Sequence, residues 1–231
     1  MPVTAAIIVP AYNEEKTIFP CIKALRRSFE LSTHIYVVDN RSTDGTPRLA
    51  QACGATVLHA DEQGKGYAVF RGVAEALETG ADWIVLHDAD GEYSATDVFY
   101  LLQKCQAHSD PITPMMGVGL RQVSLGQVLW RSVFANWMTK RLLAFSTGKK
   151  PPSDILTGAR VFNRSAAIAL FNPEQVILGG FELETGLTRR AMQKNIRIVE
   201  ADVHYTPRSA GEKKISAWDM LPIAKTAINI G

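Results

Sequence analysis

The first hundred residues alternate between short apolar runs and segments whose apolar residues recur at helical spacing. The runs are Ala5–Val9, Ile35–Val38, Thr56–Leu58 and Trp83–Leu86, and each is followed by turn residues or a polar cluster. Strand-like runs separated by helices are typical of βαβ units, and strands that are apolar throughout are covered on both faces of a sheet. We therefore predict an α/β fold with a mainly parallel sheet flanked by helices.

Helical spacing occupies the segments between these runs. The predicted helices of this half are Glu14–Phe29, with Asn13 as its N-cap, Thr46–Cys53 and Tyr67–Glu78. No linker-like stretch divides the chain, so residues 1–231 are predicted to form one domain. The second half is predicted to add helices at Asp97–Gln106, Gln127–Phe145 and Glu184–Lys194 and strands at Ile112–Val118, Gly158–Phe162 and Ile196–Tyr205.

The near-neutral charge balance, 25 Lys+Arg against 23 Asp+Glu, is an average over two different halves. Residues 1–100 hold 8 basic and 14 acidic residues, which leaves 17 and 9 for residues 101–231. Pro111 to Ser153 contains no acidic residue at all. This asymmetry favours an anionic partner such as phosphate, anionic lipid or nucleic acid, with a solvated basic face as the alternative. No zinc, helix-turn-helix or RNA-binding signature supports nucleic acid.

The three cysteines, Cys21, Cys53 and Cys105, lie far apart and form no C-x-x-C pair. This spacing argues against a disulfide framework or a zinc site and is typical of a reducing cytosol. No apolar stretch is long enough to span a membrane, and Met1 to Pro10 is expected to be a first strand, not a signal peptide. A cytoplasmic location is therefore expected.

Asp88-Ala89-Asp90 is the sharpest chemical feature of the sequence. Side chains two residues apart in an extended segment point to the same side, so both carboxylates are expected to converge where the fourth strand ends. Their repulsion favours a shared cation, and Mg²⁺ or Mn²⁺ held with substrate phosphates is the natural occupant. Glu92 can join them if the chain stays extended. The alternative is a solvated acidic turn.

Further polar residues follow the other predicted strands. Asp39 can accept from a base or a ribose hydroxyl, or it can form a turn that caps the next helix. Glu14 and Glu15 are candidate ligand contacts, although the helix dipole alone favours acids in a first turn. The Gly64-Lys65-Gly66 turn can bring backbone amides and a lysine to phosphate.

The motifs of several other enzyme classes are absent from the sequence. Neither a phosphate-binding G-x-x-x-x-G-K-[ST] loop nor a G-x-G-x-x-G after the first strand is present, and there is no G-x-S-x-G or H-E-x-x-H. His87 is interpreted as a structural neighbour of the acidic pair. The candidates for binding phosphate in the second half are basic, and each can equally be an ordinary surface residue: Arg160, Arg208, Lys213 and Lys214.

Six segments together resemble family-two glycosyltransferases with a GT-A fold, especially the dolichyl-phosphate mannose synthase-like branch. They follow in the expected order across nearly the whole chain: V-P-A-Y-N-E-E at 9–15, V-V-D-N-R-S-T-D-G-T at 37–46, G-K-G-Y-A at 64–68, D-A-D-G-E-Y at 88–93, D-I-L-T-G-A-R-V-F at 154–162 and R-S-A-G-E-K-K-I-S at 208–216.

The resemblance implies a nucleotide-diphosphate sugar donor and a metal ion, Mg²⁺ or Mn²⁺. Residues 1–110 would bind the donor and residues 111–231 the acceptor. Lys65 belongs to the donor site, and Lys213 stands where that branch usually has Ser. By the same resemblance, the nucleoside would be surrounded by Pro10, Tyr12, Glu14 and Asp39, and the metal would be held by Asp88, Asp90 and Glu92. The donor phosphates would be bound by Arg121 and Arg160. Catalysis would involve Asp90 together with Arg131, Arg208 and Lys214.

Two kinds of acceptor fit such an enzyme. A polyprenyl phosphate is already an anion and needs no general base, whereas a hydroxyl of a small molecule or glycan needs a carboxylate to take its proton. The candidate bases are Asp154, Glu182 and Glu184, each of which can instead be a salt-bridge partner. A non-catalytic nucleotide-sugar-binding module is a third interpretation, which the intact Asp88 and Asp90 argue against.

A lipid acceptor offers an explanation for the segment from Pro111 to Ser153, which has no acidic residue. Its basic residues alternate with Trp130, Phe134, Trp137 and Phe145, a composition suited to the cytoplasmic face of an anionic membrane. In the alternative interpretation, this is an amphipathic helix that packs its aromatic side chains on the sheet.

Overall fold

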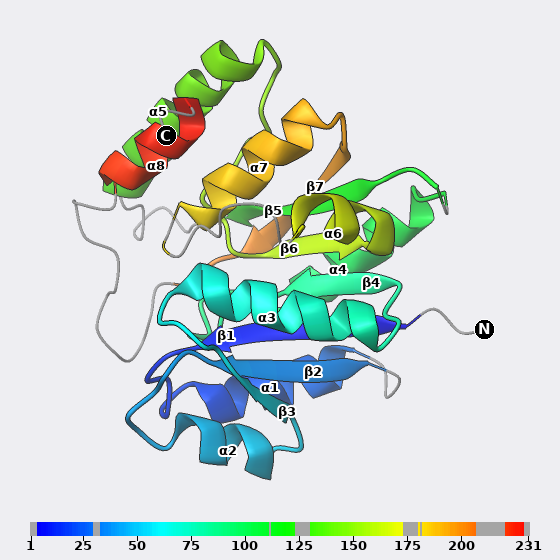
Figure 1. Cartoon of the computed structure of the whole chain (residues 1–231), viewed down its shortest axis with the longest axis vertical. Helices are drawn as coiled ribbons and strands as arrows, with labels where there is room; N and C mark the ends of the chain where they lie inside the picture. The colour runs from blue at the N-terminus through cyan, green and yellow to red at the C-terminus, as the bar shows by residue number, and fades with distance from the viewer. Residues whose placement is uncertain are drawn as a thin grey trace.

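A computed structural model of the chain describes residues 4–29, 33–110, 112–122, 130–172, 180, 182–206 and 220–228. Its centre is a seven-stranded sheet with the strand order β3-β2-β1-β4-β6-β5-β7 (Figure 1). The strands are β1 (Ala5–Ala11), β2 (His34–Asp39), β3 (Thr56–His59), β4 (Trp83–Leu86), β5 (Met115–Gln122), β6 (Arg160–Asn163) and β7 (Arg197–His204).

Strand pairing is parallel throughout except at β6, which is antiparallel to both β4 and β5. The prediction of an α/β fold with a mainly parallel sheet is therefore confirmed. The helices are α1 (Ile18–Ser28), α2 (Thr46–Ala52), α3 (Lys65–Glu78), α4 (Ala95–Ala107), α5 (Trp130–Thr147), α6 (Arg164–Leu170), α7 (Leu183–Gln193) and α8 (Met220–Ile228). Sequence patterns predicted neither α6 nor α8.

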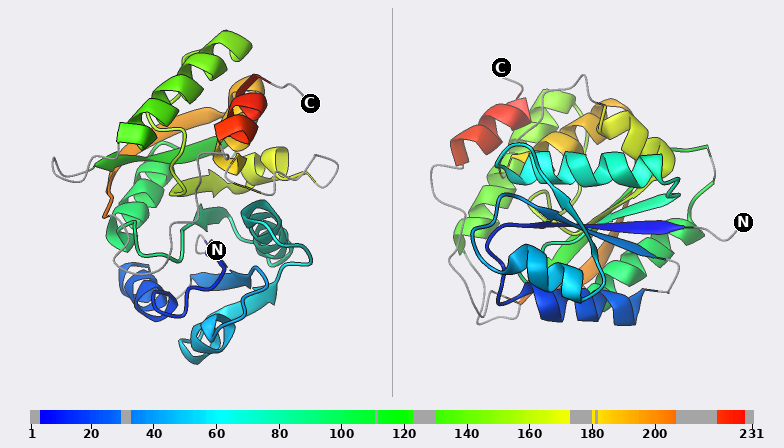
Figure 2. Two further views of the ribbon diagram at one scale, coloured as in Figure 1. Left: turned by 90° about the vertical axis from the view of Figure 1, so that its left-hand side faces the viewer. Right: turned by 60° about the horizontal axis from the view of Figure 1, so that its bottom comes forward.

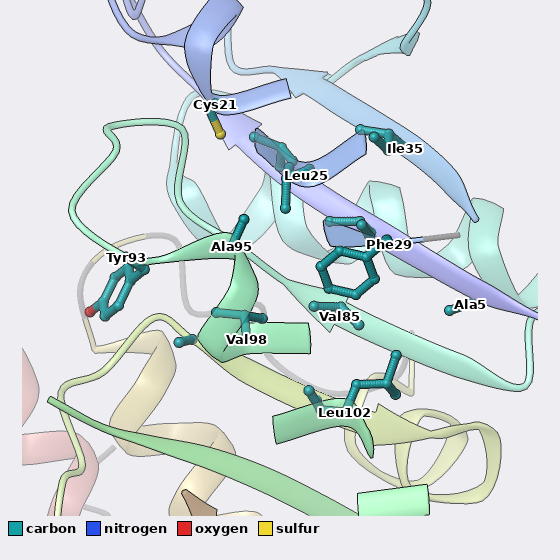
Figure 3. Packing of buried hydrophobic residues seen from close by; sticks show 14 of the residues in the cluster. Ala5, Cys21, Leu25, Phe29, Ile35, Val85, Tyr93, Ala95, Val98 and Leu102 are labelled. Atoms are coloured by element: carbon teal, nitrogen blue, oxygen red, sulfur yellow. The ribbon is translucent and has the colours of Figure 1, made fainter. Parts of the chain in front are cut away.

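Alternate residues of the central strands enter two separate cores. In β1, Ile7 and Val9 pack among buried residues of α1, α2 and α4, whereas Ile8 packs with α3, α6 and α7 on the opposite face. Figure 3 shows the first of these clusters, with Phe29 and Val85 among its members. The apolar strand runs are therefore explained, as predicted, by a sheet that is covered on both faces.

The first helix begins later than its sequence pattern suggests. α1 starts at Ile18, and Asn13 has a φ of 52°, in the left-handed region, so it does not cap the helix. Its side-chain oxygen instead accepts a hydrogen bond from the Thr43 backbone amide at 2.8 Å. Asn tolerates this backbone conformation better than most residues, which is why it suits the turn that precedes the helix.

α5 and α8 lie side by side at one end of the molecule, and α2 lies at the other (Figures 1 and 2). The buried side of α5 carries Ala135, Thr139 and Leu143, and Leu143 shares a small core with Ala227 of α8. The aromatic residues Phe134, Trp137 and Phe145 are exposed. The alternative interpretation, in which α5 packs its aromatic side chains on the sheet, is wrong for these three residues.

Close contact between α3 and the sheet depends on Gly72. A Cβ atom built there would lie 2.4 Å from Cγ2 of Ile8 and 2.9 Å from Cγ2 of Val38, two fully buried side chains. Glycine inside a helix costs about 1 kcal/mol relative to alanine, yet overpacking costs about 1–3 kcal/mol. The close approach of α3 to β1 and β2 therefore outweighs helix propensity at this position.

We predict that Gly72→Ala destabilises the protein by about 1–2 kcal/mol, because the overpacking exceeds the gain in helix propensity. Chemical denaturation measures the change in unfolding free energy. Ala74→Ser, on the exposed side of the same helix, is the control and should change it by no more than about 0.5 kcal/mol. A more stable Gly72→Ala variant would contradict the packing described here.

Candidate active site

The sequence-predicted site residues gather at one edge of the sheet. The parallel register pairs Ala11 with Asp39 at the carboxyl ends of β1 and β2, and β4 ends beside them at Leu86. Because β6 runs antiparallel, its first residue, Arg160, pairs with Leu86 and lies at the same edge. The strand order reverses between β1 and β4, and such a point in an open α/β sheet is where ligands bind.

The loops that follow β1 and β2 hold each other in place. The backbone amide of Asn13 donates to Oγ of Ser42 at 3.0 Å, and that of Glu14 donates to Oγ1 of Thr46 at 2.8 Å. The buried Glu14 carboxylate accepts from Oγ1 of Thr17 at 2.9 Å. Much of the N-E-E and S-T-D-G-T motifs therefore serves to hold these two loops together. Of the other two predicted nucleoside contacts, Pro10 lies in β1 and Tyr12 in this loop, and both are partly buried.

Asp39 is the last residue of β2 and is almost fully buried. One carboxylate oxygen accepts from the Ser42 backbone amide at 3.2 Å, and the other lies 3.3 Å from Nδ1 of His59. The turn predicted as the alternative role of Asp39 therefore exists, but it does not cap the next helix, because α2 begins at Thr46 with Gly45 as its N-cap. A role in binding the nucleoside stays a prediction, since this turn also places the carboxylate at the ligand-binding edge.

Asp88 follows β4, where it is held by an ion pair and a close backbone contact. Its Oδ1 lies 2.8 Å from Nζ of Lys65, the first residue of α3. Its Oδ2 would lie 2.2 Å from a Cβ atom built on Gly158, so only glycine permits this approach. The backbone amide of Gly158 in turn donates to the hydroxyl of Tyr93 at 3.1 Å. The carboxylate thus has one well-defined position.

Lys65 joins the two halves of the chain. Its ammonium lies between Asp88 and Glu184, 2.7 Å from Oε1 of the latter, which belongs to the first turn of α7. Burial disfavours the charged lysine, but the two carboxylates outweigh this effect and raise the pKa of Lys65. The lysine is therefore a permanent cation at the ligand-binding edge.

Three carboxylates act electrostatically on the same buried thiol. Burial raises the pKa of Cys21 to about 12, and the negative charges of Asp90, Asp88 and Glu14 add to that increase. These acids therefore lie within electrostatic range of one point, although Ala89 and Asp90 belong to a turn and not to the extended segment that the spacing argument assumed. A concentration of negative charge at this edge favours a cation.

Glu92 does not complete a three-carboxylate metal site. Among the described residues, no three His, Cys, Asp or Glu side chains come together as a metal-binding group. Burial, and next the Glu92 carboxylate that hydrogen-bonds the hydroxyl, raise the pKa of Tyr205. Asp90 meanwhile accepts from the backbone amide of Glu92 at 3.1 Å. The prediction that extended backbone aims all three carboxylates at one ion is thus not supported, because the chain turns at Ala89 and Asp90.

Arg121 is engaged by a buried acid. Its guanidinium donates to both carboxylate oxygens of Asp154, at 2.6 and 2.8 Å, and stacks over the ring of Tyr205. Burial opposes its charge, but the hydrogen bonds from Arg121 to Asp154 raise the pKa of the guanidinium. The pairing satisfies both charges and positions the segment that leads to Gly158.

The structure contradicts the prediction that Arg160 binds donor phosphate. Its side chain is fully buried and donates to the carbonyls of Thr157 and Ile155 and to the hydroxyl of Thr188. Burial lowers the pKa of Arg160. An arginine at the start of a strand has the same sequence context whether it faces a ligand or, as here, fixes a loop from beneath.

His87 is buried beside the acidic pair. Its Nδ1 donates to the Asp88 carbonyl at 2.8 Å, since a carbonyl can only accept. Burial lowers the pKa of His87, although the Asp88 charge opposes the change, so the imidazole is neutral at neutral pH. These contacts support its interpretation as a structural neighbour.

The remaining predicted residues fall outside the described part of the chain: Arg208, Lys213, Lys214 and the side chain of Arg131. Sequence reasoning also missed two positions that shape the site, Gly158 and Tyr93. Both lie inside segments that matched the family, but only a structure shows the contacts that need them. Figure 3 shows Tyr93 at the margin of the core, with its hydroxyl pointing away from the cluster.

The architecture is that of a GT-A glycosyltransferase, with an acidic pair after a central strand and loops gathered at the carboxyl edge. The family model for glycosyl transferase family 2 matches residues 6–171. The chain belongs to this family and is an enzyme of the glycosyltransferase class.

Curated relatives cover most of the chain. It is 30% identical over 214 residues to glycosyltransferase AglJ of Haloferax volcanii, covering 91% of this chain and 65% of that relative's length. It is 28% identical over 223 residues to the undecaprenyl-phosphate mannosyltransferase of Micrococcus luteus, covering 90% and 86%. It is also 28% identical over 225 residues to the polyprenol monophosphomannose synthase of Mycolicibacterium smegmatis, covering 91% and 80%.

Solved structures support the fold. Glucosyl-3-phosphoglycerate synthase of Mycobacterium tuberculosis, in complex with Mn²⁺, UDP and phosphoglyceric acid, matches with a TM-score of 0.74 at 20% identity. The match covers 98% of this chain and 76% of that one. The same enzyme with Mg²⁺ and UDP matches with a TM-score of 0.73 at 20% identity, covering 98% and 77%. Among the described residues of this chain, no helix is long and apolar enough to cross a membrane.

We predict that Gly158→Ala weakens metal-dependent binding of a nucleoside diphosphate by more than about tenfold, because the new methyl group displaces the Asp88 carboxylate. The backbone of Gly158 is not in the left-handed region, so alanine should not prevent folding. Calorimetric titration of UDP and GDP with Mn²⁺ measures the change.

Gly148→Ala is the control. Gly148 has a φ of 68°, and a Cβ atom added there would meet nothing within 4 Å. Alanine at this position should therefore cost about 1 kcal/mol of stability without changing nucleotide binding. Equal binding by wild type and Gly158→Ala would show that the Asp88 position does not matter.

Proposed function

We propose that the chain transfers a sugar from a nucleotide-diphosphate donor to a polyprenyl-type phosphate, with help from Mg²⁺ or Mn²⁺. The observation that carries the donor half is Asp88 and Asp90 at the carboxyl end of β4, with Asp88 fixed by Lys65 and Gly158. Family membership supports this assignment, and UDP with Mn²⁺ or Mg²⁺ in the structural neighbours agrees with it.

The residues present fit a hard divalent ion. Asp88 and Asp90 offer carboxylate oxygens, the ligands that Mg²⁺ and Mn²⁺ prefer. Both are charged close to the same point, because after burial their negative charges are the next causes that raise the pKa of Cys21. Mg²⁺ is commonly held by one or two carboxylates together with substrate phosphates, so a third protein ligand is not needed. When bound, the ion would neutralise charge that develops on the departing nucleoside diphosphate.

The chain's own residues contribute position and charge. Lys65 is a permanent cation at the edge where the diphosphate would lie, and Glu184 keeps its ammonium in place. Asp39 and the interlocked loops after β1 and β2 form the side of the site proposed for the nucleoside. Residues 1–110 would thus bind the donor, and residues 111–231 the acceptor, with Arg131, Arg208 and Lys214 proposed to meet phosphate.

The described geometry favours a phosphate acceptor over a hydroxyl. All three candidate bases are engaged: Asp154 by Arg121, Glu184 by Lys65, and Glu182 by the backbone amide of Gly180 at 3.1 Å. A phosphate is an anion at neutral pH and attacks without losing a proton to the enzyme. One of its oxygens would bond to the anomeric carbon as the bond from that carbon to the donor diphosphate breaks. The undecaprenyl phosphate in the name of one relative and the polyprenol monophosphomannose in that of another agree with this choice.

The donor half is tested with Asp90→Asn. We expect the variant to lose more than about tenfold in affinity for UDP or GDP when Mn²⁺ is present and to match wild type when metal is chelated, because the amide removes only the charge. The control is Asp82→Asn at the opposite end of β4, where the carboxylate accepts from the Thr4 backbone amide at 2.8 Å. Unchanged metal-dependent binding by Asp90→Asn would remove Asp90 from the site.

The acceptor half is tested by competition between two prenyl compounds of the same chain length, one a monophosphate and the other the free alcohol. We expect mass spectrometry to detect sugar on the phosphate alone when UDP- and GDP-sugars are supplied with Mn²⁺, because Asp154, Glu182 and Glu184, the candidate bases for an alcohol, are all engaged. Transfer to the alcohol, or only to a glycan hydroxyl, would refute the phosphate acceptor while leaving the donor site intact.

A further inference from the structure

We propose that the outer side of α5, with α8 beside it, docks the enzyme on an anionic bilayer. This inference rests on the proposed function, since it supplies the surface on which a lipid phosphate would be met. The surface, called here the α5 face, consists of Val133, Phe134, Trp137, Arg141 and Phe145.

The α5 face reverses the usual arrangement of an amphipathic helix. Large apolar residues normally point inward, yet Phe134 is 61% exposed, Trp137 53% and Phe145 88%. The residues that α5 buries are smaller on average, with Ala135 and Thr139 among them. Because small residues let helices approach closely, the helix uses its inner side for contact with its neighbours and leaves the aromatic side free.

The exposed side chains form one ordered stripe. They follow at helical spacing, and the rings of Phe134 and Trp137 stack with their centroids 5.9 Å apart. The guanidinium of Arg141 lies 5.3 Å from the centre of the Trp137 ring. An apolar ring beneath a cation matches the boundary between acyl chains and anionic headgroups, where tryptophan and arginine both place their polar ends in water.

The positive charge near the α5 face favours an anionic bilayer as its binding partner. The stretch from Pro111 to Ser153 has no acidic residue, α5 carries Lys140 and Arg141, and the exposed Lys150 follows its end. The neighbouring helix α8 carries Leu221, which is 60% exposed, and the exposed Lys225. A protein partner would need its own acidic apolar patch, whereas a bilayer with anionic lipid offers both properties over any area.

The α5 face is also fixed relative to the proposed active site. Asn136, on the inner side of α5, donates to the carbonyl of Ser153 at 2.9 Å and accepts from the amide of Ile155 at 2.8 Å. These two residues flank Asp154, which holds Arg121. A helix tied in this way would present a membrane-bound acceptor to the site at a constant height.

The test is co-sedimentation with vesicles, without donor or acceptor. We expect wild type to bind vesicles that contain phosphatidylglycerol as about a third of the lipid, to bind pure phosphatidylcholine weakly, and to dissociate as salt is raised. Replacing Phe134, Trp137 and Phe145 together by serine should weaken binding to the anionic vesicles by more than about tenfold.

The control carries serine at three exposed apolar residues elsewhere, Tyr100, Ile112 and Ile168, and should bind like wild type. Circular dichroism melts show whether each variant is folded. Wild type that binds neither kind of vesicle would overturn the proposal, and so would equal binding by the α5-face variant. Loss of a dimer in that variant during sedimentation velocity, with no vesicle binding by wild type, would assign the α5 face to a second copy of the chain instead.

A transfer assay separates this proposal from the proposed function. With a short, water-soluble prenyl phosphate, the α5-face variant should transfer sugar at the wild-type rate. With a long-chain acceptor in anionic vesicles, it should be slower by more than about tenfold. Vesicle binding without transfer to any phosphate would refute the acceptor assignment and leave the docking surface standing.

Discussion

The ammonium of Lys65 is the interaction on which the arrangement of the site depends. It lies within 2.8 Å of Asp88 and 2.7 Å of Glu184, so one cation compensates two carboxylates from segments far apart in the sequence. Without it, both acids would face each other in a poorly solvated region, a situation that costs several kcal/mol (about 3–5 when a buried partner is removed). The lysine thus fixes α3, the end of β4 and the start of α7 relative to one another.

This dependence also explains how a metal could share the site. Asp88 is already placed by Lys65 and by the close approach of Gly158, so it has little conformational freedom to lose when a cation and a diphosphate bind. Preorganisation of this kind lowers the cost of binding and favours charge stabilisation during the reaction. Under the proposed function, Asp90 would supply the second negative charge, while Glu92 is engaged with Tyr205.

Much of the fold could be predicted because its signals are local. Apolar strand runs, turn residues and helical spacing indicated the parallel sheet and placed Asp39 and Asp88 at its carboxyl edge. The roles of Arg160 and Asn13 could not be predicted in this way. Arg160 is satisfied by carbonyls of a loop and by Thr188, and Asn13 by a loop thirty residues away. Such contacts depend on tertiary packing, and a ligand-binding residue has the same sequence context.

The orientation of α5 is a second feature that sequence patterns could not predict. Its large apolar residues occur around much of the helix, so the pattern alone allows either the aromatic or the small side to face inward. Which side of α5 faces inward depends on α8. Ala227 of α8 packs against Leu143, and the Ala227 carbonyl accepts a hydrogen bond from the Ser146 hydroxyl at 2.6 Å. Sequence patterns did not predict α8, and its close packing is what leaves Trp137 and Phe145 exposed. The basic, aromatic surface is therefore a consequence of helix pairing, and the hydrogen bonds of Asn136 connect it to the loop that carries Asp154.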